Sequence, residues 1–227
     1  YRMHQTIADY ARALMEENTQ LFERLIAYMT HFIETHGNDY NAIEQEHVNI
    51  LAALEEAARR GLEREFMQGV IAFAPFLRIR GLHDEARLYL QRGYQIAQKL
   101  GDDLEKMKVL SHLGQMSERQ SEYKEAEHYL SEGVHLARKY EQTEYICLFL
   151  ANLGTVMDRI GEYQQAETYL QEGLLLARQL DQPERICQTI CSLGIVANHQ
   201  GTYTSAEPLL SEALALARRF EYKEYIM

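Results

Sequence analysis

The 227-residue sequence has no tryptophan, only three prolines and only three cysteines. Few prolines and a 46% share of hydrophobic residues are typical of a folded, helix-rich protein and exclude a disordered chain. The cysteines, Cys147, Cys187 and Cys191, are too few and too unevenly placed for a disulfide framework, which favours a reducing compartment. No long apolar run occurs either, because "VIAFAPFL" at residues 70–77 is far shorter than the ~20 residues that cross a bilayer. We therefore expect a cytoplasmic protein with no membrane partner.

Basic residues are also scarce, with 23 lysines and arginines against 34 acidic residues and a formal net charge of -11. They are scattered among acidic residues, whereas phosphate binding needs clustered lysine and arginine, so nucleic acid is not expected as a partner. The sequence has no glycine-rich phosphate loop, no Gly-x-Ser-x-Gly and no His-Glu-x-x-His motif. We expect no catalytic residues, no cofactor in this segment and no enzyme activity.

The cysteines raise the question of a metal site. Cys187 and Cys191 lie one helical turn apart, and Cys147 precedes Cys187 by one repeat, so the three could approach one another. A structural zinc site normally takes four ligands, and the possible additional ligands, His112 and His199, lie in other columns of the repeat. We expect no metal site and interpret the cysteines as small apolar packing residues.

A segment of twenty residues occurs three times in nearly the same form, at an interval of forty residues. The segments are "SEYKEAEHYLSEGVHLARKY" (121–140), "GEYQQAETYLQEGLLLARQL" (161–180) and "GTYTSAEPLLSEALALARRF" (201–220). Within each, small and apolar residues follow the i, i+4, i+7, i+8, i+11 spacing of one helix face. A second set of columns lies about twelve residues upstream, at Leu113, Leu153 and Leu193 and the glycines Gly114, Gly154 and Gly194. Each repeat therefore holds two helices.

Between the two helices the chain has Gly81, Ser121, Gly161 or Gly201, where a tight turn needs unusual backbone angles. An antiparallel helix pair follows, and we expect the glycine column and Ala126, Ala166 and Ala206 to allow close approach of the two helices. One such pair cannot bury its own apolar stripe, but stacked neighbours can. The sequence therefore predicts an all-α solenoid.

The succession of Leu-Gly, then Gly-x-Tyr, then alanine, then an apolar residue four positions on resembles the tetratricopeptide repeat. This resemblance implies a right-handed superhelix of antiparallel helix pairs, here with a 40-residue period as in kinesin-light-chain repeats instead of the usual 34. The first repeat is degenerate, with Ala74 in the glycine column and Pro75 inside its first helix. The expected repeats are residues 63–102, 103–142, 143–182 and 183–222, with residues 223–227 opening a truncated fifth.

Two amphipathic helices are predicted before the repeats, within residues 19–62, separated by a loop and cap at Gly37, Asn38 and Asp39. An N-terminal cap of the array and a linker between two domains are equally good interpretations of this segment. Both helices are expected to stack on the first repeat.

The opening "YRMHQTIADYARALM" resembles the end of the winged-helix domain of STAND-class, or NB-ARC, signalling ATPases, and "EQEHVNILAALEEA" (44–57) resembles the linker that follows it in bacterial members. Residues 1–18 would then be a remnant of that domain. The resemblance implies that His4 senses the phosphate of ADP or ATP in the parent protein, although Gln5 replaces the family's aspartate. The other interpretation of His4 is an ordinary exposed histidine. Since the chain begins at Tyr1, we expect it to be an excised piece of that parent.

In tetratricopeptide arrays the first helices of successive repeats line an inner groove that receives a peptide or protein. By family position the lining residues are Gln115, Glu118, Arg119, Asn152, Thr155, Asp158, Arg159, Gln188, Asn198 and His199. The lysines and asparagines of the family's carboxylate clamp are not reproduced, which indicates a different partner. The alternative is that these residues are solvated faces with local ion pairs.

Two functional hypotheses remain. The first is the sensor or partner-recognition arm of a STAND-type ATPase, and the second is a constitutive scaffold without a nucleotide switch. Because the array stops within a fifth repeat, we also expect the fragment to self-associate through the uncovered face of its last helices.

Overall fold

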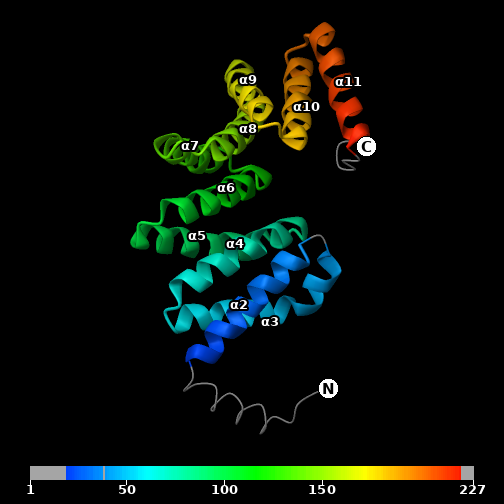
Figure 1. Cartoon of the computed structure of the whole chain (residues 1–227). Helices are drawn as coiled ribbons and strands as arrows, with labels where there is room; N and C mark the ends of the chain where they lie inside the picture. Colours follow the sequence, from blue (N-terminus) through cyan, green and yellow to red (C-terminus); the bar gives the residue numbers. More distant parts are fainter. Residues whose placement is uncertain (1–18, 38, 221–227) are drawn as a thin grey trace. The chain divides into compact units, whose positions relative to one another are not determined.

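A computed structural model describes residues 19–37 and 39–220 (Figure 1). Over these residues the chain is all-α, as predicted, with no β-strand. The described helices are α2 (Thr19–Thr35), α3 (Tyr40–Arg59), α4 (Glu63–Ile79), α5 (His83–Leu100), α6 (Asp103–Arg119), α7 (Tyr123–Lys139), α8 (Thr143–Ile160), α9 (Tyr163–Gln179), α10 (Pro183–His199) and α11 (Tyr203–Arg219). They form two compact units, Tyr1–His112 and Leu113–Met227, and the division falls within α6.

The chain reverses direction at a left-handed residue every twenty positions. Between α3 and α11, glycine has a positive φ at residues 61, 81, 101, 161 and 201, and Ser121, Glu141 and Asp181 take the same conformation at the other three connections. The next backbone N–H then caps the finished helix: Glu162 N donates to Met157 O at 2.9 Å after α8, closing the αL turn typical of helix ends. The turns predicted at Gly81, Ser121, Gly161 and Gly201 are confirmed, and their regular spacing gives the helices nearly equal lengths.

The glycine column of the first helices lies against the leucine column of the second helices. A Cβ added at Gly194 in α10 would lie 2.7 Å from Leu210 Cδ2 of α11, and one at Gly154 in α8 would collide with Leu170 of α9. The Gly154 Cβ would also lie 3.2 Å from the carbonyl oxygen of Ala166. The predicted close approach of paired helices at the glycine and alanine columns is therefore observed in the second unit.

In the first unit, α2 and α3 both pack against α4. Asp39 caps α3, because its Oδ1 accepts the N–H of Ala42 at 3.1 Å, as expected for the loop at this point. The apolar face of α2 is buried at Phe22, Ile26 and Ile33. The helix α4 continues through Pro75 to Ile79.

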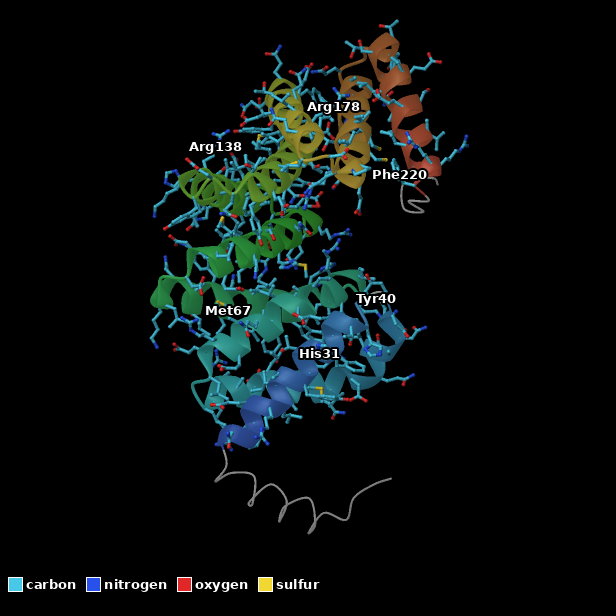
Figure 2. The ribbon with its side chains drawn as sticks, in the orientation of Figure 1. His31, Tyr40, Met67, Arg138, Arg178 and Phe220 are labelled. Atoms are coloured by element: carbon cyan, nitrogen blue, oxygen red, sulfur yellow. The ribbon has the colours of Figure 1, made fainter. Side chains whose placement is uncertain are left out.

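The second helices of the second unit are joined by ion pairs that repeat with the 40-residue period. Arg138 of α7 lies 2.7 Å from Glu172 of α9, and Arg178 of α9 lies 3.7 Å from Glu212 of α11 (Figure 2 labels both arginines). All four side chains are largely exposed, so these pairs contribute little to stability. They do show that equivalent residues occupy equivalent places in successive repeats.

The last helix pair differs from the others in how much of its apolar face is covered. Leu130 and Leu170 are fully buried at 0% exposure, whereas the equivalent Leu210 of α11 is 37% exposed. Tyr203 is 67% exposed at the start of the same helix. An apolar stripe that neighbouring helices cover elsewhere is thus partly open on α11.

Candidate ligand-binding surface

All ten groove residues predicted from the sequence lie in the second unit, on the last turns of α6 and on α8 and α10. These are the first helices of three successive helix pairs. Helices α8 and α10 contact each other directly, while α9 packs between the pairs by contacting both. The first helices are thus adjacent on one side of the unit.

Two contacts on this side repeat with the same register. Arg159 Nε of α8 lies 3.6 Å from Glu118 Oε1 of α6, and His199 Nδ1 of α10 lies 2.7 Å from Asp158 Oδ1 of α8. Each joins an acidic residue to a basic residue 41 positions later in the chain. Both contacts therefore join neighbouring repeats, α6 with α8 and α8 with α10.

Asp158 is the most enclosed member of this network, with 8% exposure. The ring of His199 also lies 6.0 Å from the ring of Tyr163, the first residue of α9. The Asp158–His199 contact therefore connects the end of α8 to the end of α10 at a site flanked by an aromatic side chain. Burial strengthens such a contact relative to the exposed pairs that join α7, α9 and α11.

A small hollow of about 50 Å³ opens between α8, α9 and α10. Three predicted residues, Thr155, Asp158 and Arg159, line it together with Gly154, Leu170, Ser192, Ile195 and Val196. Ligand sites for cofactor-sized molecules span about 300–1,000 Å³. This hollow accepts one side-chain tip of a partner, not a cofactor.

Asn152 of α8 has a polar atom without a partner. Its Nδ2 is shielded from solvent and makes no hydrogen bond among the described residues. Thr155, one turn later, instead bonds its own helix, donating to Ala151 O at 3.1 Å. An unsatisfied amide N–H costs free energy, and because this one is enclosed, an oxygen acceptor reaches it only when neighbouring side chains shift.

The remaining predicted residues are not joined to the network. Gln115 and Gln188 are half-buried, Arg119 and Asn198 are exposed, and none of the four makes a side-chain hydrogen bond or ion pair with the described part of the chain. Two residues of the hollow, Ser192 and Ile195, were not predicted from the sequence, although they lie one repeat after Asn152 and Thr155. Extending those two columns by forty residues would have found both. His4 lies outside the described residues.

The first unit contains a larger cleft that the sequence analysis did not predict. It has a volume of about 400 Å³ and is lined from α2 by Ile26, Ala27, Thr30, His31 and Glu34, from α4 by Glu65, Gln68, Ile71 and Ala72, and from α6 by Glu105 and Lys108. The signal was present in the repeat register, because Gln68 and Ala72 stand 120 and 80 residues before the predicted Gln188 and Asn152. The contribution of α2 carries no such signal.

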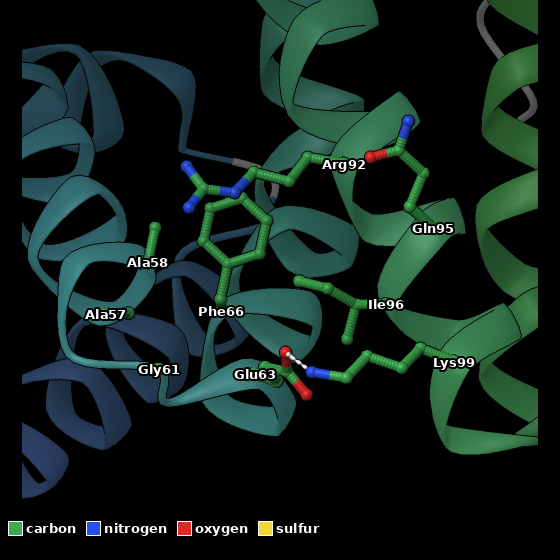
Figure 3. A pocket seen from close by; sticks show the side chains of 9 residues that line it. All are labelled: Ala57, Ala58, Gly61, Glu63, Phe66, Arg92, Gln95, Ile96 and Lys99. Carbon is green, nitrogen blue, oxygen red and sulfur yellow. Dashed lines mark hydrogen bonds and ion pairs between the residues drawn. The ribbon is translucent and has the colours of Figure 1, made fainter.

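A second cavity of the first unit, of about 240 Å³, lies where α3 turns into α4 and faces α5. Figure 3 shows Arg92 lying across the ring of Phe66, with its guanidinium carbon 5.0 Å from the ring centre, and Lys99 reaching Glu63 at 2.5 Å. These contacts use the charged groups of the cavity to hold α4 and α5 together. The cavity is therefore largely a feature of helix packing.

Burial favours the neutral forms of one histidine and three cysteines. Burial, with a smaller effect of the Arg78 charge, lowers the pKa of His112 to about 4. Burial likewise raises the pKa of the thiols of Cys147, Cys187 and Cys191. Two of these thiols make equivalent hydrogen bonds one repeat apart, Cys147 to Gly173 O and Cys187 to Ala213 O, each at 3.3 Å.

The part of the chain that the structure describes contains no cluster of three or more histidine, cysteine, aspartate or glutamate side chains suited to a metal ion. Among the same residues, no helix combines the length and the apolarity required to span a bilayer.

No protein-family model matches the chain, and no curated protein matches its sequence. Solved structures do match. A Rap protein complexed with competence and sporulation factor gives a TM-score of 0.75 at 16% identity, over 98% of this chain and 61% of that protein. The apo form of RapI gives 0.74 at 15% identity, over 88% of this chain and 73% of RapI. A putative kinesin light chain from Podospora anserina, with nearly identical tetratricopeptide-like repeats, gives 0.72 at 14% identity, over 90% and 100%.

The fold is a tetratricopeptide-like helical repeat. The resemblance drawn from the 40-residue register is confirmed at this level, including its likeness to a kinesin-light-chain array. At 14–16% identity the likeness concerns the fold, and function has to be argued from the surfaces described above.

Proposed function

We propose that this chain is a protein- or peptide-binding module, with a partner lying across the first helices of successive helix pairs. The observation that carries the proposal is the repeated contact in the second unit, Glu118 to Arg159 and Asp158 to His199. These contacts link α6, α8 and α10 through polar side chains. An extended partner on these helices meets side chains from every repeat, which is how solenoids gain affinity without a deep pocket. A protein of similar fold is complexed with competence and sporulation factor, which supports a partner-binding role for the fold.

The polar groups without a partner in the described part of the chain indicate which chemical groups a binding partner would present. Arg119 is exposed without an ion-pair partner among the described residues, and the Asn152 amide has an unpartnered N–H. Both are donors, and an arginine can hold a carboxylate through two parallel hydrogen bonds. The partner of this surface therefore presents oxygen acceptors, either backbone carbonyls or a carboxylate.

The binding experiment starts from a random peptide library displayed on phage and selected on the immobilised chain. The affinity of a selected peptide is then measured by calorimetry for the wild type, Asn152→Ala and Arg119→Glu. We expect each substitution to weaken binding about tenfold or more, equivalent to about 1.4 kcal/mol. Asn152→Ala should not lower the free energy of unfolding, because it removes an unsatisfied donor.

The matched control is Gln182→Ala, since Gln182 also has a shielded atom without a hydrogen bond, Oε1, but lies just before α10 and outside the predicted surface. That variant should bind like the wild type. Unchanged affinity in both Asn152→Ala and Arg119→Glu would remove the partner from this surface.

We further infer that the module is the sensor arm of a STAND-type signalling ATPase, in which partner binding favours an open, assembling form of the parent. The support is the resemblance of residues 1–15 and 44–57 to the corresponding segments of that class, with His4 as the nucleotide-sensing residue. A switch requires that the partner bind the two states with different affinities. The test is the partner's affinity for the parent protein loaded with ADP and with an unhydrolysable ATP analogue. Equal affinities, or a parent without a phosphate loop upstream of Tyr1, would favour the constitutive scaffold.

The open stripe on α11 supports self-association of the isolated chain. Leu210 is 37% exposed where its equivalents are fully buried, and covering such apolar area is favourable by about 25 cal/mol per Å². Light scattering over a concentration series should show a dimer that Leu210→Arg reverts to a monomer. A monomer at all concentrations in the wild type would contradict this proposal.

A further inference from the structure

The cleft of the first unit differs from the surface of the second in size and in charge. Its volume of about 400 Å³ lies within the range of sites that enclose a ligand, whereas the hollow on the second unit holds one side-chain tip. Three helices form its walls, and the apolar side chains Ile26, Ile71 and Ala72 are on the lining. A ligand with an apolar group can therefore bury that group here.

The charged residues of the cleft are mostly acidic. Glu34, Glu65 and Glu105 line it, against Lys108 as the single lysine or arginine and His31 on α2 (His31 is labelled in Figure 2). Glu105 is compensated, because its carboxylate lies 2.7 Å from Lys108 Nζ. Glu34 and Glu65 have no ion-pair partner among the described residues. Two uncompensated carboxylates on facing helices, α2 and α4, leave the cleft without the positive charge that would balance it.

From this geometry we propose that the α2–α4–α6 cleft binds a short peptide segment in which a lysine or arginine side chain is flanked by apolar side chains. The cation lies between Glu34 and Glu65, and the apolar neighbours contact Ile71 and Ala72. Charge complementarity selects the basic residue, and burial of the flanking side chains distinguishes a peptide from a bare cation. The inference rests on the proposed function as a peptide-binding module, but it concerns different helices.

The cleft also assigns a role to α2, which precedes the repeats. A peptide bound there contacts α2 on one side and the repeat helices α4 and α6 on the other, so binding strengthens the packing of α2 on the array. In a longer protein, a change in the packing of α2 on ligand binding would be transmitted to the segment that precedes α2. The segment at residues 19–35 is thus part of a binding site as well as a cap or linker.

The probes are two blocked pentapeptides, acetyl-Ala-Leu-Arg-Leu-Ala-amide and its counterpart with glutamate in place of arginine, together with spermidine. Calorimetry with the full chain should show the arginine peptide binding at least tenfold more tightly than either of the others. The double variant Glu34→Gln/Glu65→Gln should lose about tenfold in affinity for the arginine peptide. The control Glu23→Gln/Glu127→Gln changes the overall charge equally at exposed positions outside the cleft and should bind like the wild type.

Hydrogen exchange should locate the bound peptide, with slower exchange in α2 and α4 than in the free chain. Equal affinity for the arginine and glutamate peptides, equal affinity for spermidine, or no binding at millimolar peptide would overturn the proposal. If the arginine peptide binds but its affinity falls only in Asn152→Ala and Arg119→Glu, the cleft is not its binding site. The proposed function would then be supported by the surface of the second unit alone. If the library selection yields no peptide while the cleft still binds the arginine peptide, the proposed binding surface of the second unit is refuted and the proposal for the cleft stands.

Discussion

A single methyl group added to the glycine column should show how tightly the helix pairs are packed. At Gly154 an alanine Cβ would lie 2.7 Å from Leu170 Cδ2 and 3.2 Å from the carbonyl oxygen of Ala166, both closer than the usual contact distance of about 3.5–4.0 Å. At Gly173, on the partner helix α9, the nearest atom would be Leu150 Cβ at 3.6 Å, which is an ordinary contact. The two positions lie in the same helix pair and differ in the room that each leaves for an added Cβ.

The expected free energies of unfolding follow from two opposing effects. Replacing glycine by alanine inside a helix stabilises it by about 1 kcal/mol, whereas overpacking a close contact costs about 1–3 kcal/mol. Gly173→Ala should therefore be neutral or stabilising by up to about 1 kcal/mol. Gly154→Ala should be destabilising by up to about 2 kcal/mol, the overpacking cost less the helix gain.

The assay is urea denaturation followed by circular dichroism, combined with a double-mutant cycle. Leu170→Ala alone should cost about 2–4 kcal/mol, because Leu170 is fully buried. In that background Gly154→Ala should no longer destabilise, which gives a coupling energy of about 2 kcal/mol. Equal effects of the two glycine substitutions, or additivity with Leu170→Ala, would refute the close packing of α8 on α9.

Three further predictions concern the turns, the buried histidine and the thiols. Ser121→Gly, Glu141→Gly and Asp181→Gly should each stabilise the chain by about 0.5–1 kcal/mol in urea denaturation, because each substitution removes a side chain from a left-handed residue with φ of 49–61°. The reverse change Gly161→Ala, at φ 86°, should be destabilising. A loss of stability in all three glycine variants would contradict the argument that these residues are strained. The folded protein lowers the pKa of His112 from 6.5 to about 4, so protonation below pH 6.5 favours the unfolded state. The contribution of His112 to the free energy of unfolding is therefore complete above pH 6.5 and falls by up to about 3 kcal/mol as the pH falls towards 4. Denaturation at several pH values should therefore show a steeper acid loss for the wild type than for His112→Gln, and identical slopes would mean that His112 is not the group responsible. Since burial raises the pKa of all three thiols, iodoacetamide at pH 8 should label the native chain far more slowly than the chain in urea, and rapid labelling of native Cys147 or Cys187 would be inconsistent with their enclosure.

The sequence alone was sufficient for the helix pairs and their turns, because both depend on local and periodic signals. The left-handed turns favour a glycine, as at Gly81, Gly161 and Gly201, and an uninterrupted register then locates the turn at Ser121 by position. The contact between the glycine and leucine columns follows from the same period. What repeats at a fixed interval can be extrapolated from one repeat to the next.

The partners of the groove residues could not be read in the same way. Arg119 and Arg159 occupy the same column, but the residue 41 positions earlier is Glu118 for Arg159, with which it pairs, and Arg78 for Arg119. This 41-residue offset between partners depends on how neighbouring repeats stack, and the sequence of one repeat does not contain it. The cleft of the first unit was missed for a related reason, because α2 has no counterpart in the repeat register.

Hydrogen exchange of the full chain, with and without the arginine pentapeptide and with and without a library-selected peptide, is the most direct test of the idea that partners bind the first helices of the pairs. The account predicts slower exchange in α2 and α4 with the pentapeptide and in α8 and α10 with the selected peptide, and no change in α7, α9 and α11. Protection concentrated on α7, α9 or α11 would place the partner on the second helices of the pairs and contradict this idea.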